Sequence, residues 1–191
     1  MARHGVAPGA RGSGSRQTTG TSGTASVYSR RGRHRPLRCH LWRTAVTGVP
    51  REIDGAPVPD EVVRAAEFHT HLGPFLIVGL RMGHVITRAL GREPFTVHIR
   101  AHTGRKPPYS CTADGLQCST PCTVGNGGLQ VTDRRDMSAE GECDGRRVVV
   151  KLRSEVFDSI RRDCNDENQE RYAMRLWEAT DDELFEIEEV R

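Results

Sequence analysis

The segment Phe68-His69-Thr70-His71-Leu72-Gly73-Pro74-Phe75 decides the fold, because one helix is expected to end inside it and the longest helix to begin. Pro74 suits the first position of a helix, where its missing amide hydrogen leaves no hydrogen bond unmade. From Pro74 to Leu90 the side chains are apolar almost all round, which predicts a helix deep in the core. Gly91 follows as a stop signal.

Two histidines precede this helix, and a later segment supplies thiols and a carboxylate. His69 and His71 are two residues apart, so in extended or irregular backbone both point to one side. A short helix is predicted over about residues 112–119, with Cys111 and Asp114 on one face. Imidazole and thiolate are ligands for zinc or another borderline-soft metal. We therefore expect the two segments to meet.

The residue types predict a metal site, but they leave open which residues are its ligands and what Asp114 does. We predict zinc or another divalent transition metal, held by at least three of His69, His71, Cys111 and Cys122. Asp114 is expected either to accept a hydrogen bond from a ligating histidine or to act as a general base. The alternative for the cysteines is that they are small, buried apolar residues.

A glycine-rich turn follows Cys122. Gly125 and Gly127 allow the backbone to approach a ligand closely, so they are the cofactor-binding candidates. The alternative is a simple turn into the next strand.

The same residues resemble the core-domain pattern of the FmdE family, which takes its name from a component of formylmethanofuran dehydrogenase. That pattern reads F-H-G-H-x-C-P-G, then C-x-x-D-[GA]-[IL]-Q, then T-G-C-T-x-G. The resemblance spans about residues 60–190. The matching positions are His69, His71, Pro74, Cys111, Asp114, Gly115, Gln117, Thr120, Cys122, Thr123 and Gly125. The sequence departs from the pattern at the first-block cysteine, which is Gly73, and at three glycines, which are Thr70, Phe75 and Pro121.

The resemblance implies a metal-binding protein linked to the molybdenum or tungsten enzyme that interconverts carbon dioxide and formylmethanofuran. It makes Cys111, Asp114 and Cys122 the catalytic candidates. A domain of this size has no room for a pterin–metal catalytic subunit, so we expect an accessory protein or a small redox or one-carbon enzyme. A homodimer is expected, since the family resembles dimer-forming modules and Phe185 and Ile187 form an apolar edge. A molybdenum or tungsten enzyme is the expected partner.

The composition bears on two other functions, nucleic-acid binding and the binding of a small ligand. Residues 1–50 contain nine Arg and no Lys, Asp or Glu, whereas the whole chain of 191 residues has a net charge of only +3. We expect residues 1–55 to be a disordered arm and linker, and residues 56–191 to be the domain. A solvated tail is favoured over nucleic-acid binding, because no aromatic stacking platform accompanies the charge. A module that binds a small ligand or anion without catalysis is the other alternative.

No apolar run approaches the roughly 20 residues needed to span a bilayer. We therefore expect no membrane association and a cytoplasmic protein, with cysteines that are free, metal-bound or catalytic rather than paired. Cys39, Cys143 and Cys164 belong to no motif and are expected to be buried apolar residues.

The remaining segments predict an α+β fold with an antiparallel or mixed sheet and helices packed on one side. Residues 95–102 alternate, which predicts a strand with His98 and His102 on a solvated face. Residues 128–132 and 146–152 are predicted strands, the second of them central, whereas residues 134–145 are predicted to be a polar connection. The other predicted elements are helices over 61–68, 154–163 and 167–179, followed by a capped turn and an edge strand over 181–188.

Overall fold

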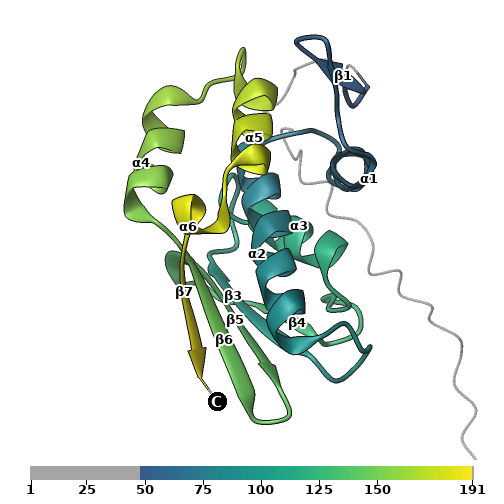
Figure 1. The fold of residues 1–191 in the computed structure, drawn as a ribbon, viewed down its shortest axis with the longest axis vertical. Coiled ribbons are helices and arrows are strands. Elements are labelled where there is room, and N and C mark those ends of the chain that lie inside the picture. The colour runs from purple at the N-terminus through teal and green to yellow at the C-terminus, as the bar shows by residue number, and fades with distance from the viewer. Residues whose placement is uncertain (1–47, 191) are drawn as a thin grey trace, which may run out of the picture. The chain divides into compact units, whose positions relative to one another are not determined.

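The computed structural model describes residues 48–190, which form an α+β fold (Figure 1). The expected disordered arm, its basic run and Cys39 lie outside the described residues. The helices are α1 (Asp60–His69), α2 (Pro74–Leu90), α3 (Cys111–Ser119), α4 (Ser154–Asp163), α5 (Gln169–Glu178) and α6 (Asp181–Leu184). The strands are β1 (Glu52–Ile53), β2 (Ala56–Pro57), β3 (His98–Thr103), β4 (Leu129–Val131), β5 (Arg135–Cys143), β6 (Arg146–Leu152) and β7 (Phe185–Val190).

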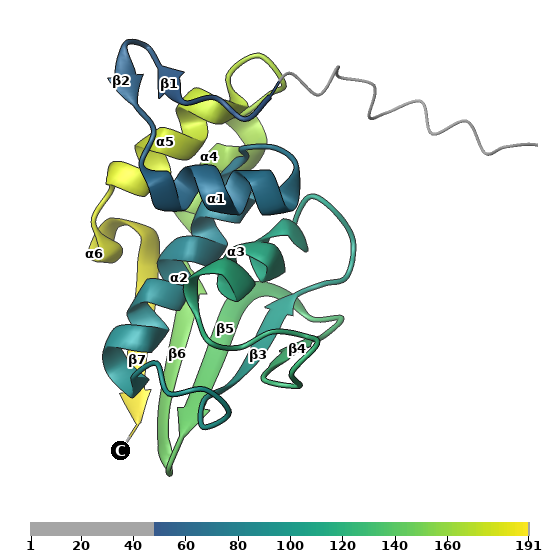
Figure 2. The ribbon, with the colours of Figure 1, turned by 90° about the vertical axis from the view of Figure 1, so that its right-hand side faces the viewer.

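The main sheet has the strand order β4-β3-β5-β6-β7. It is a mixed sheet, since β3 pairs with β4 in parallel and all other neighbours are antiparallel. The helices α2 and α3 lie on one face of it (Figures 1 and 2). The predicted fold class is therefore confirmed. Within residues 48–190, no helix combines the length and the apolar character that crossing a bilayer requires.

The prediction for residues 134–145 was wrong, because most of this segment is β5, the middle strand of the sheet. The strand β6, which was predicted to be central, is an interior strand between β5 and β7. The buried residues of β5 include Ala139 and Gly141, and such small residues give little apolar signal. They are small because α2 presses on the strand: a Cβ at Gly141 would lie 2.8 Å from Ile86 Cγ2.

The helix α2 has the predicted bounds and is the centre of the core. Every residue from Pro74 to Leu80 is buried. The helix ends as expected at Gly91, whose φ is 95° and whose amide donates to the carbonyl of Thr87. Only glycine adopts such a φ without strain.

The backbones of α2 and α3 touch through glycines. A Cβ at Gly79 would lie 2.1 Å from the carbonyl oxygen of Thr112, and a Cβ at Gly115 would lie 2.2 Å from that of Leu76. No real Cβ comes so near to backbone. This contact fixes α3, and with it Cys111, against the first half of α2.

A partly buried arginine joins α2 to the C-terminal segment. The Arg81 guanidinium donates to the carbonyls of Leu176, Trp177 and Ala179 at the end of α5, and to the carboxylate of Asp181. These oxygens have no partner inside the helix, so the arginine acts as its C-terminal cap. The chain then forms the capped turn and edge strand that the sequence predicts, as α6 and β7.

A hairpin occupies the expected boundary between linker and domain. The strands β1 and β2 pair with each other in antiparallel fashion. Between them, Asp54 receives two hydrogen bonds, of 2.6 and 2.8 Å, from the guanidinium of Arg171 on α5.

Candidate functional site

The two sequence segments meet where α1 ends and α3 begins. His69 is the last residue of α1, and Cys111 is the first residue of α3. The Nδ1–H group of His69 donates to Oδ2 of Asp114 at 2.7 Å. The Cys111 side chain lies close enough to the His69 ring to raise the pKa of the ring. One helical turn on α3 thus presents a thiol and a carboxylate to one imidazole.

The second nitrogen of His69 is buried and unpaired. Its side chain is only 10% exposed, and Nε2 has no hydrogen-bond partner in the structure. A buried polar atom without a partner is rare in folded proteins. A metal-ligating histidine characteristically gives one ring nitrogen to a carboxylate and the other to the ion. His69 therefore fits the role of a metal ligand.

The two histidines differ in charge. Burial lowers the pKa of His69, but Asp114 and Cys111 outweigh it and raise that pKa from 6.5 to about 9. Burial lowers the pKa of His71, and the neighbouring positive charge of His69 lowers it further. At neutral pH His71 is thus an uncharged imidazole, whereas His69 is a positively charged imidazolium.

A left-handed residue turns the chain between the two rings. Thr70 has a φ of 76°, a conformation that is costly for a β-branched residue. The ring centroids of His69 and His71 lie 4.4 Å apart as a result of this turn. The FmdE pattern has glycine here, which adopts the same φ without strain.

Gly73 faces the ring of His71. A Cβ at Gly73 would lie 3.3 Å from Nε2 of His71 and 3.9 Å from Oε1 of Gln169. A side chain at this position, where the FmdE pattern has cysteine, would therefore meet the His71 ring. Gln169 belongs to no motif, so no local pattern could have pointed to it.

Cys122 lies apart from the histidine pair. It is 1% exposed, and its thiol donates to the carbonyl of Val97 at 3.1 Å. Burial raises the pKa of this thiol. Residues 48–190 contain no group of three or more His, Cys, Asp and Glu side chains already placed around a metal position. A metal site of three or four of the predicted ligands is thus not assembled among these residues and stays a prediction.

The glycine turn is closed by its own hydrogen bonds. Oδ1 of Asn126 accepts from the amides of Thr123 and Gly128, and Oε1 of Gln117 accepts from the amide of Val124. These amides are therefore not available to an anion. Gln117 also donates to Asp114 at 3.2 Å, so it links the turn to the site. Gln117 matches the family pattern, but no role for it was expected.

One predicted surface histidine is buried. His102 is 5% exposed and bonds to Thr132 at 2.8 Å and to Glu140 at 3.1 Å. The expectation of a solvated side chain was wrong, because β5 places a carboxylate beside it. His98, on the same face of β3, is exposed as expected.

The raised pKa of His69 predicts a pH dependence of stability for the metal-free protein. Protonation of His69 should stabilise the fold fully below about pH 6.5, and this contribution should disappear as the pH rises through about 9. Chemical denaturation across this range and NMR titration of the ring measure the effect. The change Asp114→Asn should lower the pKa of His69, since burial then dominates. A parent His69 that titrates below 6.5 would contradict the site geometry.

Comparisons with known proteins agree with the fold. A crystal structure of a tungsten formylmethanofuran dehydrogenase FmdE-like protein from Syntrophus aciditrophicus has a similar fold, with a TM-score of 0.56 and 22% identity. The match covers 74% of this chain and 76% of that one. A protein of Archaeoglobus fulgidus, named a probable S-adenosyl-L-methionine-binding protein, is 30% identical over 149 residues. That match covers 67% of this chain, which spans about 40% of the relative's length.

The model of one protein family matches residues 68–189, from the segment before α2 to β7. Its description is "FmdE, Molybdenum formylmethanofuran dehydrogenase operon". The matched region includes His69, Cys111 and Asp114, and it covers more than half of the chain. The chain therefore belongs to the FmdE family.

Proposed function

We propose that the protein binds a zinc-like divalent metal ion through His69, His71 and Cys111, and that it works as a metal-handling accessory protein in the metabolism of molybdenum or tungsten formylmethanofuran dehydrogenase. The observation that carries the proposal is the buried, unpaired Nε2 of His69, whose other nitrogen is fixed by Asp114. Family membership and the name of the similar solved structure support the metabolic context.

Each residue has a distinct part in this proposal. Asp114 orients the His69 ring and fixes its tautomer. His71 offers a neutral nitrogen, because burial and the charge of His69 keep its pKa low. His69 must lose the proton on Nε2 before this nitrogen can bind an ion. The affinity of the site for the ion should therefore rise with pH. A bound divalent ion would supply Lewis acidity and lower the pKa of a coordinated water.

The number of ligands favours a labile site. Three protein ligands leave a position open for water, a substrate or a ligand from another protein. Gly73 lies beside the ring of His71, so a donor side chain at this position would approach the ion next to His71. An open position is what a protein that passes a metal to a partner requires, and it is also what a small hydrolytic or redox enzyme requires.

Metal content tests the proposal. Protein purified without added metal should contain about one zinc-like ion per chain by elemental analysis. His69→Ala and Cys111→Ser should each lower zinc affinity at least about tenfold, since each removes a ligand. Cys164→Ser is the matched control, because Cys164 follows α4 as its C-terminal cap and is not one of the proposed ligands. Equal affinity in all variants, or none in the parent, would refute the site.

One further variant separates three ligands from four. Cys122→Ser should leave zinc affinity unchanged if the Cys122 thiol stays on the Val97 carbonyl. A loss as large as that of Cys111→Ser would show that Cys122 moves to the ion. The small-ligand alternative has less support, because the amides around Gly125 and Gly127 already donate within the turn.

A further inference from the structure

Gln117 connects the candidate metal site to the exposed turn at residues 124–127. It follows Asp114 by one turn of α3, so the two side chains lie on the same face of the helix. The side-chain nitrogen of Gln117 donates to Oδ1 of Asp114 at 3.2 Å, and its oxygen accepts from the backbone amide of Val124 at 3.1 Å. The other oxygen of Asp114 accepts from His69. A continuous chain of hydrogen bonds therefore runs from the His69 ring to the turn.

The backbone decides which way the side-chain amide of Gln117 faces. A backbone N–H group can only donate, so the Gln117 atom that meets Val124 must be the oxygen. The nitrogen is then turned toward Asp114. The turn itself is held by Asn126, whose Oδ1 accepts from two backbone amides at the ends of the turn. Gln117 therefore presents a donor to Asp114 in a fixed direction.

A donor on each oxygen fixes the carboxylate of Asp114 in one orientation. The side chain of Asp114 is 35% exposed, so packing alone restrains it weakly. Its orientation matters because it sets the direction of the His69 ring. Loss of the group that orients a ligating histidine typically lowers metal affinity about 10- to 100-fold.

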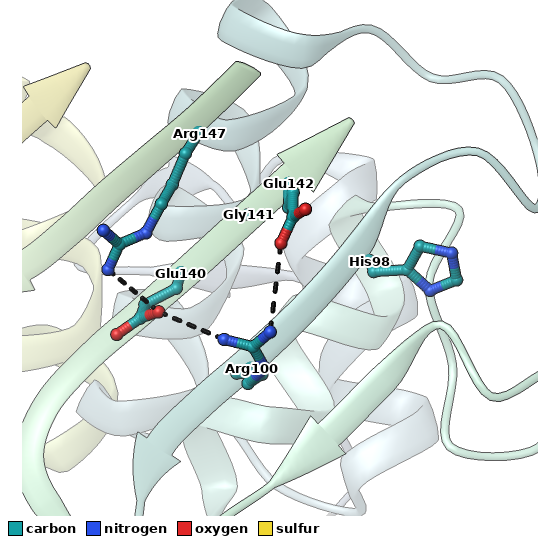
Figure 3. Close-up of a pocket in the computed structure, with 6 residues that line it drawn as sticks. All are labelled: His98, Arg100, Glu140, Gly141, Glu142 and Arg147. Carbon is teal, nitrogen blue, oxygen red and sulfur yellow. Dashed lines mark hydrogen bonds and ion pairs between the residues drawn. The ribbon is translucent and has the colours of Figure 1, made fainter. Parts of the chain in front are cut away.

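A second histidine–carboxylate pair in the protein is held in another way. Nε2 of His102 bonds to Oε1 of Glu140 at 3.1 Å. The other oxygen of Glu140 lies 3.1 Å from the guanidinium of Arg147 and 3.5 Å from that of Arg100 (Figure 3). These two positive charges offset the charge of the carboxylate. His102 therefore meets a carboxylate whose charge is shared among several partners.

The second partner of Asp114 is uncharged. Among residues 48–190, no arginine or lysine forms an ion pair with Asp114, and its second donor is the amide of Gln117. Such a donor orients the carboxylate without offsetting its charge. A carboxylate behind a ligating imidazole makes the imidazole a stronger ligand. The charge of Asp114 is thus left to act on His69 and on an ion bound there.

We propose that Gln117 is a positioning residue for the metal site and that it couples this site to the turn at residues 124–127. The role rests on the metal binding proposed above. Gln117 is not itself a ligand, since it acts on Asp114, which in turn acts on His69. Ordering at one end of the chain of hydrogen bonds is then felt at the other, because coupling between two sites is reciprocal.

The zinc affinity of Gln117→Met, measured by competition with a chelator, tests this role. Methionine has nearly the length of glutamine but makes neither hydrogen bond, so affinity should fall about fivefold or more. Gln130→Met, the same change at an exposed position of β4, should bind zinc as the parent does. Equal affinities of the parent and Gln117→Met would overturn the proposal. A parent that binds no zinc would instead refute the metal site itself.

A double variant shows whether Gln117 acts through Asp114. Asp114→Ala removes the carboxylate that Gln117 holds, so adding Gln117→Met to it should lower zinc affinity no further. An effect of Gln117 on the fold alone would lower affinity by the same factor in both backgrounds. Equal factors would therefore rule out the positioning role.

Hydrogen exchange followed by NMR provides a readout without metal. In the metal-free protein, the Val124 amide should exchange faster in Gln117→Met, which removes its acceptor. It should also exchange faster in Asp114→Ala, which removes the group that steadies Gln117. The amide of Gly128, which bonds to Asn126, is the internal reference and should not change. Equal exchange at Val124 in the parent and in Asp114→Ala would show that the turn and the site are not coupled.

Discussion

Replacing Gly115 by alanine is expected to destabilise the protein by about 3 kcal/mol or more. The new Cβ would lie 2.2 Å from the carbonyl oxygen of Leu76 and 2.6 Å from the amide nitrogen of Leu80. Both are backbone atoms of a buried helix, so they cannot yield as the end of a flexible side chain does. The two helices must separate, and each loses buried contacts along its length. Urea denaturation of Gly115→Ala against the parent measures the loss.

The matched control is Gly125→Ala in the exposed turn. A Cβ there would meet nothing closer than 3.8 Å, and its φ is not positive, so this variant should be nearly as stable as the parent. Any folded Gly115→Ala protein should also bind zinc more weakly, since separating α3 from α2 moves Cys111 away from His71. Equal stability of the two variants would show that the helices are not in backbone contact.

Restoring a thiol with Gly73→Cys is expected to tighten zinc binding by about tenfold or more, which corresponds to about 1.4 kcal/mol. Gly73 has a φ of −140° and a ψ of 162°, a conformation open to any residue and favoured before proline. The new Cβ would lie 3.3 Å from Nε2 of His71, so the ring must shift by a few tenths of an ångström. The new thiolate would then add a second soft donor beside Cys111, next to the imidazole of His71.

A competition titration of zinc against a chelator measures this change. Gly73→Ser is the control, because it has nearly the same size but replaces the thiolate by a poor zinc ligand. Tight binding by the cysteine variant alone would support a metal position between Gly73 and His69. Equal affinities in the parent and both variants would mean that the Gly73 segment does not face the ion.

Local signals were enough to predict the central helix and the meeting of the segments that contain His69 and Asp114. The helix α2 is marked by Pro74 at its start, Gly91 at its end and apolar residues between them. Accepting a hydrogen bond from a histidine was one of two roles expected of Asp114, and the structure contains such a bond with His69.

Long-range packing decided what the sequence could not predict. The middle strand β5 escaped notice because contact with α2 requires small residues such as Gly141 there. The burial of His102 depends on the register of β3 against β5, which brings Glu140 beside it. Cys122 bonds to Val97, a residue 25 positions earlier, and no local pattern records this contact.

The edges of the sheet bear on aggregation. An edge strand offers unpaired backbone groups to which a strand of another molecule can add. At one edge, β7 carries Glu186, Glu188 and Glu189, so an approaching identical strand meets like charge. At the other edge, β4 has three residues, which is too short to template a long strand. The folded domain should therefore resist fibril formation by edge-to-edge growth.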